Sequence, residues 1–269
     1  MTGVLAIGAK ARAALEASGC EARPLAAFPD APYFEAGGEI VWVGSRLPAM
    51  HPRAVVTAEP VARGAIARFT ALPDAAWSPA LPANGREVAT ACGHLCDDIA
   101  SFGEARGFGP LLAGEQLPFP LDLAVARVRA LAAAYRDDDT LAVYQASRAL
   151  LGLGGGLTPS GDDLVGGALF GRLLVAADAA PWRKIGGRLA ADAQRASHAI
   201  SAALLADLVA GASFAPLHAL ADALAAGEDA AARTAARALV ALGHSSGWDM
   251  LVGLVLCVTG ATTKEEGPL

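Results

Sequence analysis

Hydrophobic positions recur with two different spacings along this chain, and the change falls near residue 82. Before it, short apolar runs such as 39–44 and 54–57 are separated by turn residues, which predicts a small β-rich domain over residues 1–82. From Arg86 onward, apolar residues recur at helical spacing, which predicts a larger all-α domain over residues 86–269. The expected helices span about 86–103, 120–135, 139–151, 162–178, 183–211, 215–226, 228–242 and 248–261. The predicted fold class is therefore α+β.

One helix–glycine loop–helix pattern occurs twice in the helical part. Residues 146–154 (ASRALLGLG) resemble residues 235–243 (AARALVALG), and residues 160–167 (SGDDLVGG) line up with residues 246–253 (SGWDMLVG). The first copy carries an insertion between its two blocks. We interpret the pair as a duplicated unit.

The first copy contains a glycine-rich loop before a helix start. Glycines let the backbone turn and approach a ligand closely, and the free N–H groups of a helix start suit an anion or a polarised oxygen. The candidate binding residues of this loop are Gly154, Gly155, Gly156, Thr158, Ser160 and Gly161. Ser160-x-x-Asp163 also fits a capping box, which would make the same loop a purely structural helix entry.

Comparison of the two copies separates structural from functional candidates. Asp163 aligns with Asp249, and both follow a serine by three residues, so both are expected to be structural caps. Asp162 aligns with Trp248, and Thr158 aligns with His244. We therefore take Asp162 and His244 as the candidate catalytic residues, although a histidine in a turn is more often a plain hydrogen-bonding residue.

Glycines inside the two motif helices predict close packing. Gly166, Gly167 and Gly253 lie in predicted helix interiors, where glycine costs up to about 1 kcal/mol relative to alanine. That cost is consistent with close approach of another backbone. We expect the two helices to pack together about a pseudo-twofold axis, so that both loops, including Ser245 and Ser246, meet in one site.

Composition narrows the function classes. Hydrophobic residues make up 54% of the chain, charged residues 18%, and the net charge is −6 without a lysine–arginine cluster, so nucleic acid is not an expected partner. The apolar segments are too short or too interrupted to span a bilayer, and Met1 to Lys10 lacks the apolar core of a signal peptide. We expect a cytoplasmic protein. The segment from Cys92 through His94 to Cys96 resembles a metal cluster, but without further ligands nearby, buried thiols are expected.

The two motifs together resemble a known family. GGGLTPSGDD at residues 154–163, followed by GHSSGWD at residues 243–249, is similar to the AllH-type subunit of oxamate carbamoyltransferase. The resemblance covers about residues 146–170 and 235–255 and is faint in the N-terminal region. It implies a subunit of a multi-protein enzyme of purine (allantoin) nitrogen catabolism, which interconverts oxalurate plus phosphate with oxamate plus carbamoyl phosphate. The partners implied are a small-molecule substrate and other protein subunits.

Such a transfer needs protein groups that donate hydrogen bonds to the phosphate oxygens and to the developing oxyanion. Amides of the glycine loop and of the Ser160 and Ser246 turns are candidates, with the Thr158 and Ser245 hydroxyls, and His244 is a candidate proton donor or shuttle. Asp162 and Asp163 would repel a phosphate unless Mg²⁺ lay between them. Alternatively, Asp162 binds an amide NH₂ group and no phosphate enters.

Two other functions remain open from the sequence. The chain could be a non-catalytic assembly subunit whose loops are only tight helix junctions. It could also be a stand-alone amide hydrolase, although it lacks the Gly-x-Ser-x-Gly nucleophile elbow and a strand before it.

Overall fold

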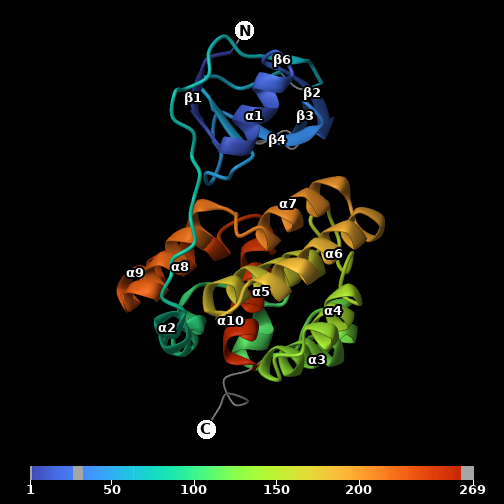
Figure 1. Ribbon diagram of the computed structural model, residues 1–269, viewed down its shortest axis with the longest axis vertical. Coiled ribbons are helices and arrows are strands. Elements are labelled where there is room, and N and C mark those ends of the chain that lie inside the picture. The colour runs from blue at the N-terminus through green and yellow to red at the C-terminus, as the bar shows by residue number, and fades with distance from the viewer. Residues whose placement is uncertain (1, 27–32, 63, 262–269) are drawn as a thin grey trace. The chain divides into compact units, whose positions relative to one another are not determined.

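The structure is a computed structural model that describes residues 2–26, 33–62 and 64–261 (Figure 1). The chain divides into two compact units. One comprises Met1–Ala80 with Ser213–Ala215, and the other comprises Leu81–Ala212 with Pro216–Leu269.

The N-terminal unit is built on a six-stranded mixed sheet with the strand order β1-β5-β4-β3-β2-β6. Its strands are β1 (Val4–Ile7), β2 (Glu21–Ala26), β3 (Tyr33–Ala36), β4 (Glu39–Gly44), β5 (Ala54–Thr57) and β6 (Ala67–Arg68). Neighbouring strands are antiparallel except β4 and β5, which are parallel. The N–H of Thr2 donates to the carbonyl of Arg68 at 2.9 Å, so the two edges of the sheet meet.

A helix in this unit, α1 (Ala9–Ala17), was not predicted from the sequence. Its alanine-rich segment has strong helix formers, but they stand among strand-like runs that dominate the pattern. Ala11, Ala14 and Leu15 pack in one cluster with sheet residues such as Phe34 and Val41. The helix therefore supplies part of the core of the sheet unit.

The second unit is helical. Its helices are α2 (Gly85–Asp97), α3 (Val125–Arg136), α4 (Thr140–Arg148), α5 (Ser160–Val175), α6 (Ala180–Ala196), α7 (Ala199–Val209), α8 (Ala215–Ala226), α9 (Asp229–Val240) and α10 (Ser246–Thr259). Short 3₁₀ turns lie at Ile99–Ser101, Gly109–Ala113 and Leu121–Ala124. A mixed sheet followed by a helical region confirms the α+β class. No described helix is long and apolar enough to cross a membrane.

The single helix predicted over residues 183–211 is wrong, because the chain breaks there into α6 and α7. Ser197 adopts an extended conformation with φ −137° and ψ −177°, and its hydroxyl donates to the carboxylate of Asp162. Alanines and leucines continue on both sides of the break at helical spacing, so periodicity could not reveal it.

Helices α5 and α10 form the buried centre of the helical unit (Figure 1). The two helices pack closely at Gly167 and Gly253, the two glycines at which close packing was predicted. A Cβ atom at Gly167 would lie 2.3 Å from the carbonyl oxygen of Met250, and one at Gly253 would lie 2.1 Å from that of Leu164. Gly167 and Gly253 are equivalent positions of the two copies, as are Leu164 and Met250. The crossing therefore has the approximate twofold relation expected of the duplication.

Candidate functional site

The starts of α5 and α10 come together, so the two motif loops meet. The Thr158 and Ser246 hydroxyl oxygens are 3.1 Å apart, and those of Ser160 and Ser245 are 3.3 Å apart. Each pair joins one motif to the other. The convergence predicted from the packing glycines is thus present at the level of individual side chains.

The two helix entries also share their backbone geometry. The N–H of Gly161 donates to the carbonyl oxygen of Leu153 at 2.9 Å, and the N–H of Gly247 donates to that of the equivalent residue Leu242 at 3.1 Å. A Cβ at either glycine would lie under 2 Å from a carbonyl oxygen of the preceding helical segment, at 1.9 Å and 1.8 Å respectively. Glycine is therefore required at both positions so that the chain can fold back on itself.

Asp163 and Asp249 do not occupy the capping-box positions that were expected from the sequence. The N-cap of α5 is Pro159, which has no N–H to donate to a carboxylate, and the N-cap of α10 is Ser245. Neither N-cap side chain makes a capping hydrogen bond with the described residues. Each helix begins earlier than the capping box required, which moves both aspartates one position deeper into the first turn.

Asp163 and Asp249 instead interact across the crossing of the helices. Ser246 of the second motif hydrogen-bonds Asp163. Ser160 of the first motif hydrogen-bonds Asp249, as does Ser245. The N–H of Phe108 also donates to Asp249 Oδ1 at 2.7 Å. Each motif thus supplies a serine to the carboxyl group of the other.

Both carboxyl groups lie in the protein interior, where burial disfavours their charged forms. Asp163 is 5% exposed and Asp249 is fully buried. Burial raises the pKa of Asp249 to about 7. Burial, followed by the negative charge of Asp249, raises the pKa of Asp163 well above its usual range. The Oδ2 atom of each side chain has no hydrogen-bond partner among the described residues.

The Asp162 carboxyl group does not join Asp163 and Asp249 but accepts hydrogen bonds from Gly152, Ser197 and Ser201. Its Oδ1 accepts the N–H of Gly152 at 2.8 Å, and its Oδ2 accepts the hydroxyls of Ser197 and of Ser201, the latter at 2.6 Å. It therefore ties the start of the glycine loop to the break between α6 and α7. A Mg²⁺ ion at Asp162 would have to displace these donors.

Sequence reasoning missed Ser197, Ser201 and Phe108. The two serines lie in an apolar helical pattern, and Phe108 follows Gly107 in an irregular segment. The glycine at position 107 was the available sequence signal, because an isolated glycine often marks a turn or a close approach. In the structure its φ is +57°, and a Cβ there would lie 2.2 Å from Asp249 Oδ1.

The remaining candidate residues lie nearer the surface. Gly155 and Gly156 are exposed, Gly154 is half-buried, and Gly154 and Gly156 have positive φ of 111° and 86°. His244 is exposed in the turn before α10. Trp248 is a core residue packed against Gly109, where a Cβ would lie 2.9 Å from its ring.

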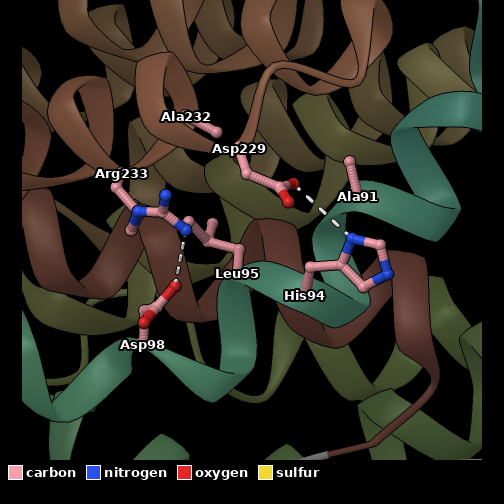
Figure 2. Close-up of a pocket in the computed structure, with 7 residues that line it drawn as sticks. All are labelled: Ala91, His94, Leu95, Asp98, Asp229, Ala232 and Arg233. Atoms are coloured by element: carbon pink, nitrogen blue, oxygen red, sulfur yellow. Dashed lines mark hydrogen bonds and ion pairs between the residues drawn. The ribbon is translucent and has the colours of Figure 1, made fainter.

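The Cys92–Cys96 segment lies apart from the motif loops in sequence, on α2. Its His94 pairs with Asp229 of α9 at 3.5 Å, and Asp98 pairs with Arg233 at 3.1 Å (Figure 2). These residues line a shallow hollow between the two helices. Cys92 is buried, and hydrogen bonding to Cys96 together with burial raises its thiol pKa.

Comparison with known proteins supports the resemblance drawn from the motifs. Residues 150–258, which include both motif loops, match the family described as oxamate carbamoyltransferase subunit AllH. Neither the curated proteins nor the solved structures gave a match. Over residues 150–258, this chain is therefore similar to the AllH family, as its two motifs indicated.

Proposed function

We propose that this chain is an AllH-type subunit of an oxamate carbamoyltransferase, acting with partner subunits in the cytoplasm in allantoin nitrogen catabolism. The matched family carries that description, and the match spans both motifs. The observation that carries the proposal is the meeting of the two motif loops through the Thr158–Ser246 and Ser160–Ser245 pairs. Such convergence favours one shared site over two separate helix junctions.

The proposed ligand is a carbamoyl or phosphate group held at the two helix starts. Helix N-termini favour negative charge, and two of them converge here. Thr158, Ser245 and the exposed amides of Gly155 and Gly156 are the proposed donors to ligand oxygens. Exposed His244 is the proposed proton donor, since an imidazole can deliver a proton near neutral pH.

The carboxyl groups take different roles in this proposal from those expected from the sequence. Asp162 becomes a positioning residue, because its oxygens hold Gly152, Ser197 and Ser201. Burial raises the pKa of Asp249 to about 7, so part of this carboxyl is protonated near neutral pH, and burial also raises the pKa of Asp163. Protonated carboxyls do not repel an anion, and this removes the need for Mg²⁺ between them and a phosphate.

A non-catalytic assembly subunit is the second candidate, and the internal hydrogen bonds of the junction favour it. The Thr158 and Ser160 hydroxyls already have partners within the chain. A stand-alone amide hydrolase has less support, because α4 precedes the glycine loop where a nucleophile elbow needs a strand.

The test is a transfer assay that follows carbamoyl phosphate formation from oxalurate and phosphate. It compares this chain alone, the partner subunits alone, and the reconstituted mixture. We expect turnover only in the mixture, and we expect Thr158→Val in this chain to lower it. Full turnover by the isolated chain, unchanged by partners, would contradict the subunit role. Full turnover of the mixture with Thr158→Val and Ser245→Ala combined would favour the assembly role.

A further inference from the structure

The Asp163 and Asp249 side chains form a buried pair that the proposed transfer reaction does not use directly. They are 5% and 0% exposed, and they lie in the first turns of α5 and α10. Each keeps one oxygen, Oδ2, without a hydrogen-bond partner among the described residues. Two buried carboxylates with unsatisfied oxygens are costly when both are ionised.

The surroundings supply donors but little positive charge. Asp163 is affected by the charges of Asp249 and Asp162 and by the Ser246 hydroxyl, and Asp249 interacts with the N–H of Phe108 and the hydroxyls of Ser160 and Ser245. Described cations on nearby elements are engaged elsewhere. Arg106 pairs with Glu104, Arg172 with Asp138 and Arg233 with Asp98, while His244 is exposed to solvent. A proton is therefore the simplest means of reducing the charge of this pair.

We propose that Asp163 and Asp249 share one proton across the crossing of α5 and α10, and that this proton holds the two motif loops together. Ser246 bonds Asp163 and also meets Thr158, while Ser160 bonds Asp249 and also meets Ser245. The carboxyl pair thus lies directly behind the hydroxyls of the loops. When the last proton leaves, two negative charges remain buried at the crossing and the loops separate. This regulation rests on the proposed function of the loops as one site, but it can be tested without a ligand.

The sign of the pH effect follows from the direction of the shifts. An unfolded aspartate titrates near about 3.9, and both carboxyls titrate higher in the folded chain. The folded protein then binds more protons than the unfolded chain. The contribution of the pair is complete below about pH 4 and is lost as the pH rises through the folded pKa values.

The experiment compares chemical unfolding of wild type, Asp249→Asn, Asp163→Asn and the double variant between pH 5 and pH 9. For each protonated carboxyl, the unfolding constant of wild type should rise about tenfold per pH unit relative to the double variant. Above pH 8, the double variant should be the more stable protein. Asp222→Asn, an exposed carboxyl on α8, is the matched control and should keep the wild-type pH dependence. Parallel pH profiles of wild type and double variant would overturn the proposal.

Infrared spectroscopy of the wild-type protein covers the case in which a variant does not fold. The carbonyl band of protonated carboxylic acids should persist near neutral pH, where exposed aspartates are ionised, and should disappear in two separated steps. Amide exchange in the loops should show lower protection factors once the second step is passed. Loss of the whole band by pH 6 would overturn the shared proton. A failed transfer assay with these titrations intact would overturn only the proposed function.

Discussion

At the scale of single residues, three neighbouring aspartates of similar sequence context have different surroundings. Asp162 accepts hydrogen bonds from Gly152, Ser197 and Ser201, whereas Asp163 and Asp249 lie between the motif helices. The duplication distinguished Asp162 from the other two, because Asp162 aligns with Trp248 whereas Asp163 aligns with Asp249. It could not assign their roles, because the donors to Asp162 come from three separate segments, namely Gly152 in the glycine loop, Ser197 at the end of α6 and Ser201 in α7.

Asp162→Ala should destabilise the protein strongly. The substitution leaves the Gly152 N–H and the Ser197 and Ser201 hydroxyls without their acceptor, and buried donors that lose a charged acceptor cost about 3 kcal/mol or more in total. Urea denaturation measures the loss in the free energy of unfolding. Asp222→Ala, on the exposed face of α8, should change it by less than about 0.5 kcal/mol. Equal stability of the two variants would show that the Asp162 cluster contributes little.

At the scale of elements, glycines set the crossing of α5 and α10. The sequence predicted this crossing because Gly167 and Gly253 occupy the same position in both copies, where a glycine in a helix interior needs a reason. The structure supplies that reason in the backbones of Met250 and Leu164. The break between α6 and α7 could not be predicted, because apolar residues continue at helical spacing on both sides and the Asp162 carboxylate that Ser197 contacts there belongs to a distant segment.

Gly167→Ala and Gly253→Ala should each destabilise the protein although alanine is the better helix former. The added Cβ would lie 2.3 Å and 2.1 Å from backbone oxygens, and such overpacking typically costs about 1–3 kcal/mol. Gly187→Ala, on an exposed position of α6 with nothing within 4 Å of its Cβ, should instead stabilise by roughly 0.5–1 kcal/mol. Thermal or urea unfolding measures the change in the free energy of unfolding for each variant. If all three substitutions destabilise the protein equally, the close crossing of α5 and α10 does not explain the loss.

At the scale of the whole molecule, the α+β class followed from the change in hydrophobic spacing near residue 82. The strand-like runs at 39–44 and 54–57 correspond to β4 and β5. Helix α1 was missed because alanine-rich segments carry little amphipathic contrast, so the pattern of strands around it prevailed. The convergence of the motif loops was predictable because a duplicated unit packed through equivalent glycines brings equivalent ends together.

The central claim is that the two motif loops act as one site, and kinetics of the assembled enzyme test it most directly. Thr158→Val and Ser245→Ala should each lower kcat/KM about tenfold or more, since a hydrogen bond to a charged group contributes about 1.5–3 kcal/mol. The double variant should differ clearly from the product of the two single effects, because residues of one network do not act additively. Thr234→Val, exposed on α9, should match wild type. Unchanged kcat/KM in both single variants, or strictly independent effects, would contradict a shared site.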